Sequence, residues 1–280
     1  MCKGERMKRI LIGYISNTKG SGLDNYIYNL VDILKTEAVQ IDLLSSAIDK
    51  ELEEKYKANP NIRFLPIDRI PHPKKRYDQI RKYAKENKYD IAYFNISEAF
   101  DCFGNLACHQ IVPVVITHSH SAGNDNQNRL KRYVSKVAHI CGRPVINKYT
   151  TYCFACSDLA ANWLFGKGKK YRLIRNTIQS KRFLYNSMNR KEVREQLGIS
   201  EETVVLGFVG NLTYSKNPFF LLQFMKELRK KIPNSYLLII GDGPLRNSLE
   251  QTASKNKQNY ILFLGKRFDI ERYYSAMDLF

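Results

Sequence analysis

The 280-residue sequence is poor in long apolar runs and in cysteine. No stretch nears the roughly 18 to 20 consecutive apolar residues that a membrane-spanning helix needs, so we do not expect an integral membrane protein. The six cysteines are few and unevenly spaced, which argues against a disulfide scaffold and favours a reducing, cytoplasmic compartment. The N-terminal segment lacks the long apolar region and the cleavage site of a secretory signal.

Acidic residues are also scarce, with 27 Asp and Glu against 45 Lys and Arg and a net charge of +18. We therefore expect an anionic partner, such as a phosphate-bearing ligand, an acidic membrane surface or nucleic acid. The excess is concentrated at 126–182, where 13 basic residues face a single acid, Asp158. Because no RNP, KH or zinc-finger pattern accompanies this charge, nucleic acid is the least favoured of these partners.

The sequence contains no Asp-x-Asp, the carboxylate pair that commonly holds Mg²⁺ or Mn²⁺ on a nucleotide diphosphate. We therefore expect neither a metal nor another cofactor, and we expect cations and backbone amides to neutralise any bound phosphate. Cys153 and Cys156 form a CxxC, but no second pair completes a zinc site. These two thiols are predicted to be structural parts of a buried strand.

Strand-like apolar runs alternate with helix-permissive segments, which predicts an α/β fold of parallel sheets covered by helices. The expected strands lie at 8–16, 39–44, 62–67, 90–95, 112–117 and 152–157 in the first part of the chain, and at 203–209, 236–240 and 260–264 in the second. Two Rossmann-like domains are predicted, at 1–180 and 201–280, joined by a charged, unpatterned linker at 181–200. The second domain looks incomplete.

Two loops of the first domain carry candidate ligand contacts. Gly20 and Gly22 lie between the first strand and the first helix, where glycine lets backbone amides approach an anion. Their spacing is not GxGxxG, so a plain turn and a phosphate or sugar contact both fit. His118 and His120 are expected in the loop that follows an apolar strand in VPVVITHSHSAG. That place suits a polar ligand contact or ordinary loop residues better than a metal site.

The second domain carries a stronger local pattern, GFVGNLTYSKNPFFLLQFMKEL, in which a strand ends at Gly210 and Lys216 precedes a helix. A lysine at a helix N-terminus opposes the helix dipole, so we favour an anion contact there over a solvated loop lysine. The next strand ends in IIGDGPLRNSLE, with Gly241 and Gly243 in a tight turn. At the carboxyl ends of adjacent parallel strands, the two turns would form two walls of a nucleotide cleft.

The segment RLKRYVSKVAHI has an amphipathic helical pattern. Its apolar residues are Leu130, Tyr133, Val134 and Val137, and its basic residues are Arg129, Lys131, Arg132 and Lys136. Such a helix suits contact with an anionic membrane surface. A basic helix that packs its apolar stripe into the core fits the pattern equally well.

In their order and spacing, NTKGSGLDNYIYNL, PVVITHSHS, FVGNLTYSKNPFFLL, LLIIGDGPLRNSLE and LFLGKRFDIERYYSAMDLF resemble the family 4 retaining glycosyltransferases of GT-B fold, and among them bacterial enzymes of capsular or exopolysaccharide synthesis. The resemblance covers nearly the whole chain from Met7. It implies transfer of a sugar from a nucleotide diphosphate donor, often a UDP-sugar, to a polyprenyl-linked saccharide, with retained configuration and generally without metal. It also implies a cytoplasmic enzyme, peripheral at the inner face of the membrane, with partner glycosyltransferases.

The resemblance assigns roles to single positions. His118 or His120 matches the histidine near the reacting sugar, and Lys216 matches the lysine that stabilises the departing diphosphate. The arginine that the family has after the glycine is Asn211 here, which removes one positive charge from the phosphate clamp. The implied donor-binding positions are Gly20, Gly22, Gly210, Asn211, Lys216, Gly241, Gly243 and Lys266.

The family pattern continues, beyond its equivalent of AMDLF, into a glutamate pair that holds the donor and a helix that returns to the first domain. Neither is in this sequence. We therefore expect a truncated glycosyltransferase with weak or no activity. The alternative is a non-catalytic fragment that binds an acceptor, a membrane or a partner transferase.

Overall fold

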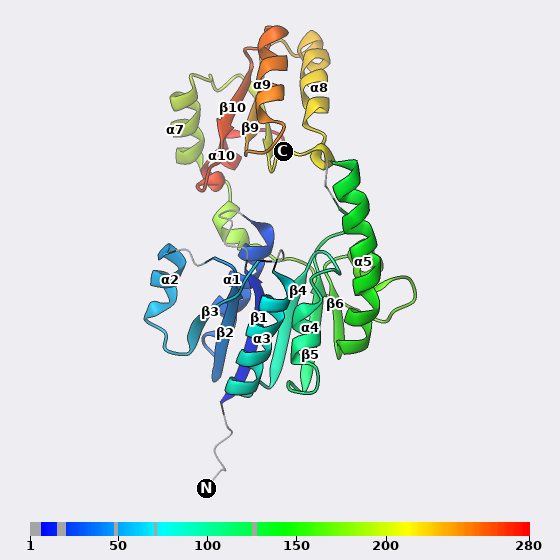
Figure 1. Cartoon of the computed structure of the whole chain (residues 1–280). Helices are drawn as coiled ribbons and strands as arrows, with labels where there is room; N and C mark the ends of the chain where they lie inside the picture. The colour runs from blue at the N-terminus through cyan, green and yellow to red at the C-terminus, as the bar shows by residue number, and fades with distance from the viewer. Residues whose placement is uncertain (1–6, 16–20, 48–49, 70–71, 125–127) are drawn as a thin grey trace. The chain divides into compact units, whose positions relative to one another are not determined.

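The computed structural model describes residues 7–15, 21–47, 50–69, 72–124 and 128–280. The chain divides into two compact units, unit 1 (Met1–Ile178) and unit 2 (Gln179–Phe280), and each has its own parallel sheet (Figure 1). Apolar residues of each unit pack into two buried clusters. Parallel sheets with helical connections confirm the predicted α/β class.

Unit 1 contains β1 (Lys8–Ile15), β2 (Val39–Ser45), β3 (Ile62–Pro66), β4 (Ile91–Ile96), β5 (Val114–Ser119), β6 (Tyr152–Ala155) and β7 (Arg172–Leu173). They form one parallel sheet in the order β3-β2-β1-β4-β5-β6-β7. β1 is buried from Leu11 onward because it has a strand on each side and helices over the sheet, so its sequence is a continuous apolar run. All the strands therefore present their carboxyl ends at one edge.

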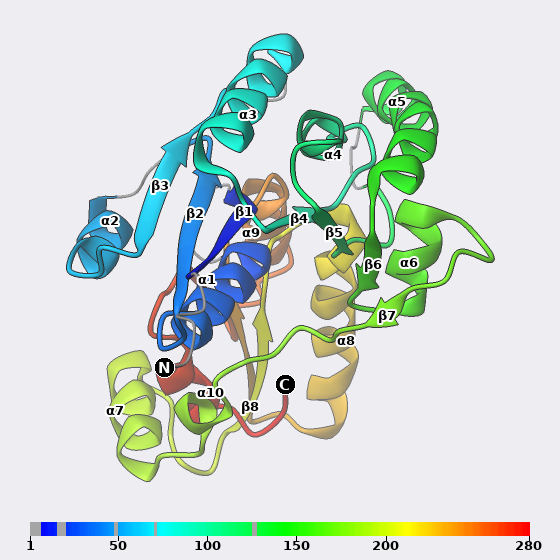
Figure 2. The same ribbon diagram turned by 90° about the horizontal axis from the view of Figure 1, so that it is seen from below.

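The helices of unit 1 are α1 (Gly22–Leu34), α2 (Lys50–Lys57), α3 (Pro73–Asn87), α4 (Phe103–Cys108), α5 (Arg129–Tyr149) and α6 (Asp158–Phe165). Figure 2 shows α3, α4 and α5 on one face of the sheet and α1 on the other. Neighbouring residues of a strand point to opposite faces, so Tyr93 and Phe94 lie in different buried clusters. Both faces of the sheet therefore contribute to the core.

Unit 2 contains β8 (Val204–Val209), β9 (Ser235–Ile240) and β10 (Ile261–Gly265), in the order β10-β9-β8. Its helices are η1 (Ser180–Phe183), α7 (Ser187–Leu197), η2 (Tyr214–Lys216), α8 (Pro218–Lys231), α9 (Arg246–Lys255) and α10 (Ile270–Ala276). Leu279 forms an isolated parallel bridge with Leu206 of β8. The nine predicted strands agree with the structure to within two residues at each end.

The segment 181–200, which we predicted to be a linker, instead forms part of η1 and the whole of α7. α7 packs against α10 and belongs to unit 2. Helices α4, α6 and α10 and the short strand β7 were also missed, and the helix expected over RLKRYVSKVAHI, residues 129–140, continues to Tyr149.

A buried arginine explains why α7 has no apolar stripe in the sequence. Arg194 is only 1% exposed, and its guanidinium donates to Asp278 Oδ2 at 2.8 Å. The same guanidinium donates to the backbone carbonyl groups of Ser200, Glu201, Thr203 and Ala276. A charged side chain therefore occupies the position at which a core-facing helix usually carries an apolar residue.

Replacing Arg194 with Met should destabilise unit 2 by about 3–5 kcal/mol, because Asp278 and four carbonyl groups lose their buried donor. The expected readout is a lower temperature for one calorimetric unfolding transition. Lys191→Met on the same helix removes a side chain that is 75% exposed and should change stability by less than about 0.5 kcal/mol. Equal unfolding temperatures in the two variants would contradict this stabilising role of Arg194.

Candidate functional site

The two histidines of unit 1 lie at the carboxyl edge of the sheet. The loop predicted for both is wrong for His118, because β5 extends to Ser119 and pairs His118 with Asn95 of β4 and Phe154 of β6. His120 follows the strand, and its ring centroid lies 4.0 Å from that of His118. Residues two apart along a strand point to the same side, so the extension of β5 brings the two imidazoles together.

His118 is fully buried and both of its ring nitrogens have protein partners. Its Nδ1 lies 2.7 Å from the Tyr93 hydroxyl and its Nε2 lies 3.2 Å from the carbonyl oxygen of Ile174. Tyr93 in turn bonds the Tyr26 hydroxyl at 2.8 Å. The carbonyl can only accept, so Nε2 carries the proton and Nδ1 accepts from Tyr93. Burial and the neighbouring His120 lower the pKa of His118 to about 3, which keeps it neutral.

His120 is half-buried and has one ring nitrogen that faces an exposed residue. Its Nε2 lies 2.9 Å from Asn95 Oδ1, and Asn95 Nδ2 donates to the Gly13 carbonyl at 2.9 Å. That second bond fixes the Asn95 amide, so His120 Nε2 is the donor. Nδ1 then carries the lone pair and lies 3.2 Å from Oδ1 of the exposed Asn176, so the Asn176 amide has to turn its Nδ2 toward the ring for a hydrogen bond between them. Burial lowers the pKa of His120 to about 4.

The structure therefore assigns different environments to the two histidines, between which the sequence could not choose. His118 is a buried support, whereas His120 has an acceptor nitrogen at the exposed side of the pair. Sequence reasoning missed Tyr26, Tyr93 and Asn95, which orient both rings. A usable signal existed, because Tyr93 and Asn95 stand at the end of β4, next to β5 in the sheet.

In unit 2 the two predicted glycine turns lie against each other. The Gly241 amide donates to the Gly265 carbonyl at 2.8 Å, and a Cβ on Gly241 would lie 1.9 Å from the Gly210 carbonyl oxygen. A Cβ on Gly243 would lie 2.6 Å from the Leu212 carbonyl oxygen. Glycine is therefore required at both positions so that the turns after β8 and β9 can pack backbone against backbone.

The basic and polar side chains of these turns are exposed. Lys216 ends η2, and within the described ranges its side chain has no hydrogen bond or ion pair. Lys266 follows β10 and lies 5.4 Å from the centroid of the Phe268 ring. Asn211 is exposed directly after Gly210. The edge of unit 2 thus presents two cations beside exposed backbone turns.

The glycine loop of unit 1 is described only in part. Gly20 lies outside the described residues, whereas Gly22 is the first residue of α1, whose N-cap is Ser21. A Cβ on Gly22 would meet no atom of the described residues within 4 Å. The described part of unit 1 therefore leaves space beside the start of α1.

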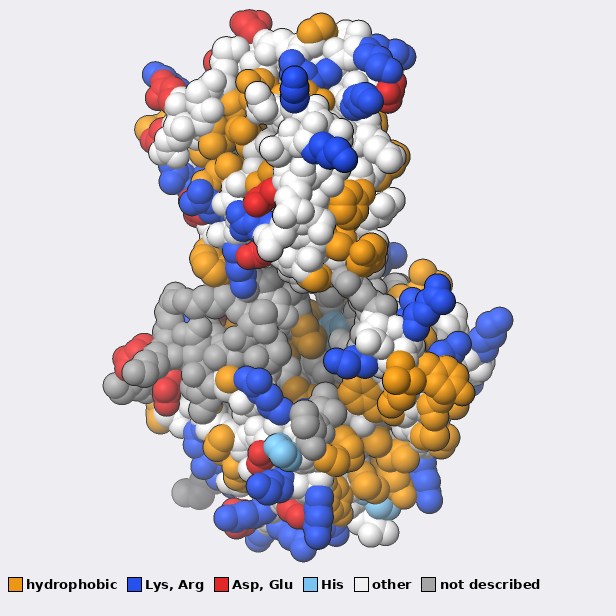
Figure 3. Space-filling model, turned by 45° about the horizontal axis from the view of Figure 1, so that its top comes forward, with side chains coloured by type: hydrophobic (Ala, Val, Ile, Leu, Met, Phe, Trp, Pro, Cys, Tyr) orange, Lys and Arg blue, Asp and Glu red, His pale blue; other side chains and the backbone are white. Residues whose placement is uncertain are grey.

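The apolar face of α5 is exposed on unit 1. Leu130, Tyr133, Val134, Val137 and Ile140 are 72, 68, 58, 43 and 52% exposed, and the neighbouring basic residues Arg129, Lys131, Arg132 and Lys136 are exposed as well. Residues nine apart in a helix point in opposite directions, and His139, nine residues after Leu130, is buried. Figure 3 shows hydrophobic and basic side chains together on the flank of unit 1 that carries α5. Of the two interpretations of the stripe, the one that packs it into the core is therefore wrong.

Two findings limit other assignments. Across the described ranges, no helix is both long and apolar enough to cross a membrane, and no three His, Cys, Asp or Glu side chains are grouped to hold a metal ion. Cys153 is a buried free thiol and Cys156 is a half-buried one. The predicted structural burial of the CxxC thus applies fully to Cys153.

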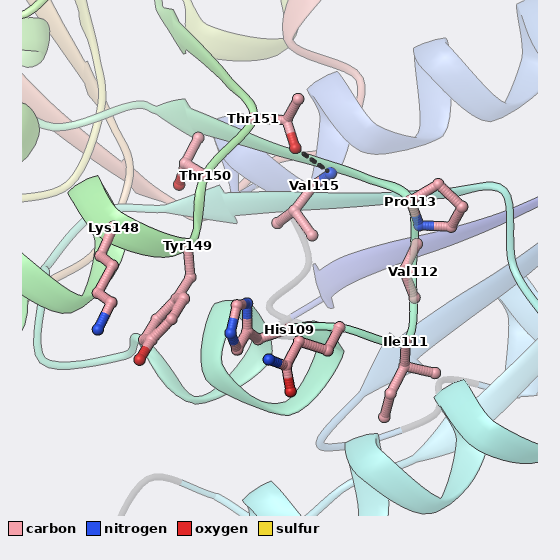
Figure 4. Close-up of a pocket in the computed structure, with 10 residues that line it drawn as sticks. His109, Ile111, Val112, Pro113, Val115, Lys148, Tyr149, Thr150 and Thr151 are labelled. Carbon is pink, nitrogen blue, oxygen red and sulfur yellow. Dashed lines mark hydrogen bonds between the residues drawn. The ribbon is translucent and has the colours of Figure 1, made fainter.

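A pocket in unit 1 lies at the opposite edge of the sheet, beside the start of β5 (Figure 4). The rings of His109 and Tyr149 lie 4.2 Å apart there, and the Val115 amide donates to the Thr151 hydroxyl at 3.0 Å. Ligands of open parallel sheets bind at the carboxyl ends of the strands. This pocket is therefore separate from the candidate site.

Residues 189–280 match the family described as glycosyl transferases group 1. The chain contains a group 1 glycosyltransferase domain. Along 98% of its length, the chain is 27% identical to a Bacillus subtilis (strain 168) protein named as a glycosyltransferase, EpsF, and covers 72% of that protein. Over 71% of its length, it is 26% identical to the UDP-Gal:alpha-D-GlcNAc-diphosphoundecaprenol alpha-1,3-galactosyltransferase of Escherichia coli and covers 53% of it. The prediction of a glycosyltransferase is confirmed.

Solved structures confirm the predicted GT-B fold around this glycosyltransferase domain. Anabaena HepE in complex with UDP and glucose matches with a TM-score of 0.72 at 18% identity, over 98% of this chain and 73% of that one. WaaG, a glycosyltransferase involved in lipopolysaccharide biosynthesis, matches with a TM-score of 0.67 at 13% identity, over 97% and 74% of the two chains. At such identities, the likeness concerns the fold alone.

The neutral histidine pair should make unit 1 less stable in acid. Unfolding releases both imidazoles, which then bind protons below pH 6.5, so the free energy of unfolding should fall by about 1.4 kcal/mol per pH unit per histidine between pH 6 and 4.5. Urea titrations followed by circular dichroism would measure this slope. In the His120→Asn variant, the slope of the free energy of unfolding against pH should be smaller in acid by one histidine's contribution. Above pH 7 the slopes of the variant and the wild type should be equal. Equal slopes in acid would refute the buried, neutral state of His120.

Proposed function

We propose that the protein transfers a sugar from a UDP-sugar to a polyprenyl-linked saccharide in capsular or exopolysaccharide synthesis, with retained configuration and without metal. The observation that carries the proposal is the pair of glycine turns in unit 2, which place backbone groups and the exposed cations Lys216 and Lys266 at the carboxyl edge of the sheet. The E. coli relative, by its name, uses UDP-Gal and a diphosphoundecaprenol-linked GlcNAc, and HepE was solved with UDP.

On the donor side, the diphosphate would be held by the turns at Gly210 and Gly241 and by Lys216. The bond between the anomeric carbon and the phosphate oxygen breaks, and the bonding pair leaves with UDP, so negative charge grows on the diphosphate. The acceptor hydroxyl forms the new bond to the anomeric carbon, and its proton passes to the departing phosphate oxygen. A lysine aimed at that charge stabilises the transition state more than the ground state. Lys216 would therefore serve in place of a divalent cation. Gly20, Gly22, Asn211 and Lys266 remain proposed donor contacts.

On the side of unit 1, His120 rather than His118 would contact the donor sugar. Its neutral Nδ1 accepts a hydrogen bond, so a sugar hydroxyl is a fitting partner. The His120 imidazole would be held in place on its buried side by His118, Tyr93 and Tyr26. A protonated His120 would offer two donors and no acceptor, so its lowered pKa favours this contact at neutral pH.

We further propose that α5 holds the protein at the anionic inner face of the cytoplasmic membrane, where a polyprenyl-linked acceptor and partner glycosyltransferases would be found. Its exposed apolar residues would enter the headgroup boundary, and the basic residues beside them would attract acidic lipid. The exposure of the stripe supports this proposal over a helix that packs its apolar stripe into the core.

Lys216→Gln tests the donor site. The variant should lower the turnover of UDP-glucose or UDP-galactose, measured as UDP released, by about 10²–10³-fold, because one charge on the leaving group is lost. Lys226→Gln removes an exposed lysine from the middle of α8 and should behave like the wild type. A wild type that binds no UDP in calorimetry would refute the proposed activity and favour the non-catalytic alternative.

The membrane proposal predicts flotation with vesicles that contain phosphatidylglycerol, weaker flotation with phosphatidylcholine alone, and loss of binding as salt rises. The double variant Leu130→Ser, Val134→Ser should bind at least about tenfold more weakly, because it removes two exposed apolar anchors. Ile33→Ser, which changes a 65% exposed residue of α1, is the matched control. Equal flotation of both variants would rule out α5 as the anchor.

A further inference from the structure

The pocket at the amino edge of the unit 1 sheet lies between the ends of two helices, α4 and α5 (Figure 4). Its volume is about 400 Å³, which is within the range of pockets that bind small molecules. His109 and Gln110 follow α4, and Lys148 and Tyr149 end α5. Because the candidate site lies at the carboxyl edge, a molecule bound here would be a ligand other than the donor.

The pocket offers unused hydrogen-bond donors and no carboxylate. Lys148 is exposed, and its Nζ lies 5.2 Å from the centroid of the Tyr149 ring. Within the described ranges, the side chains of Lys148, His109 and Gln110 form no hydrogen bond or ion pair. The Thr151 hydroxyl accepts a backbone hydrogen bond, so its own proton remains available. Among the described residues that line the pocket, none is acidic, so the lining suits an anion.

The helix ends that border the pocket are compensated by other cations. Carbonyl groups at a helix C-terminus carry partial negative charge, which would weaken the binding of an anion. Arg81 Nη1 donates to the Ala107 carbonyl in the last turn of α4 at 3.3 Å, and Lys169 Nζ donates to the Asn147 carbonyl in the last turn of α5 at 3.3 Å. Lys148 is therefore left for a ligand. One lysine among neutral donors matches a group with a single negative charge, such as a phosphodiester.

The exposed stripe of α5 leads to this pocket. Leu130 and Lys148 are eighteen residues apart, which is five full helical turns, so their side chains point in the same direction. Cys141 and Pro144, which lie between them, are exposed as well. The stripe thus continues from its apolar half to Lys148 over about 27 Å. With α5 along a bilayer surface, Lys148 would lie at the level of the lipid headgroups.

We propose that this pocket binds the phosphodiester headgroup of an anionic phospholipid. Lys148 would pair with a charged phosphate oxygen, and His109, Gln110 and Thr151 would donate hydrogen bonds to the headgroup. A lipid is favoured over a soluble phosphate because the stripe of α5 ends at the pocket. This inference rests on the membrane attachment in the proposed function, and it adds a binding site and the class of lipid that occupies it.

The probe is dihexanoyl phosphatidylglycerol, kept below the concentration at which it forms micelles and titrated into the full chain by calorimetry. Lys148→Gln should weaken its binding about tenfold, because a charge-assisted hydrogen bond is lost. Lys85→Gln removes an exposed lysine in the last turn of α3, outside the pocket, and should bind like the wild type. Dihexanoyl phosphatidylcholine should bind less tightly, because its choline cation opposes Lys148.

Gln110→Gly separates binding from folding. Gln110 has a φ of 61°, in the left-handed region that favours glycine. The variant should therefore be at least as stable as the wild type in thermal unfolding. It should nevertheless bind the probe about threefold more weakly, because the side-chain amide that donates to the headgroup is lost.

Equal binding of the probe by the wild type and Lys148→Gln would overturn the headgroup site. No binding by a wild type that floats with phosphatidylglycerol vesicles would do the same, and both results would leave the proposed membrane attachment intact. A wild type that fails to float would instead count against the attachment, and with it against a lipid in this pocket. Inorganic phosphate that matches the probe in affinity would also overturn the proposal, because the site would then recognise a soluble anion.

Discussion

The hydrogen bond from Asn95 Nδ2 to the Gly13 carbonyl fixes the geometry of the site in unit 1. Because the side-chain amide nitrogen of Asn95 donates to the backbone of β1, the side-chain amide oxygen must point to His120. His120 is then oriented by Asn95 below and by the buried ring of His118 beside it. The same side chain forms a wall of a cavity at this carboxyl edge. One interaction between neighbouring parallel strands thus orients an imidazole and shapes a pocket.

Most of the sheet could be predicted because parallel strands that are buried on both faces are continuous apolar runs. β5 is the instructive exception. Its apolar run ends before His118, but the strand continues, because β4 and β6 provide backbone partners and Tyr93 receives the polar ring. α7 was missed for a related reason, since the buried position of the helix is occupied by Arg194, whose charge is neutralised by groups far away in the sequence. Neither set of partners is visible in the local pattern.

The positions of the candidate site residues at strand ends could be inferred from the sequence, but the contacts among them could not. The glycine turns and Lys216 could be found from their order, because strand ends followed by helix starts have a recognisable composition. The choice between the two histidines depends on Tyr93 and Asn95, which lie on β4, and on Ile174, which follows β7 far away in the sequence. Whether the apolar stripe of α5 is buried or exposed depends on how the helix is rotated about its axis against the sheet. His139 and Gly142 set that rotation, whereas hydrophobic periodicity alone fits an apolar stripe in the core and one at a membrane surface equally well.

Trp163 is the only tryptophan in the chain, and its ring centroid lies 4.0 Å from that of His139. Its indole Nε1 donates to the Ser97 carbonyl at 3.0 Å, at the start of the loop that Glu98 continues. The indole therefore touches both the helix that we place on the membrane and the loop 97–101, which lines a cavity at the carboxyl edge of the sheet. The molecule carries its own optical reporter at that junction, and a shift in tryptophan emission on adding vesicles would reveal a change passing from α5 to the loop without any attached label.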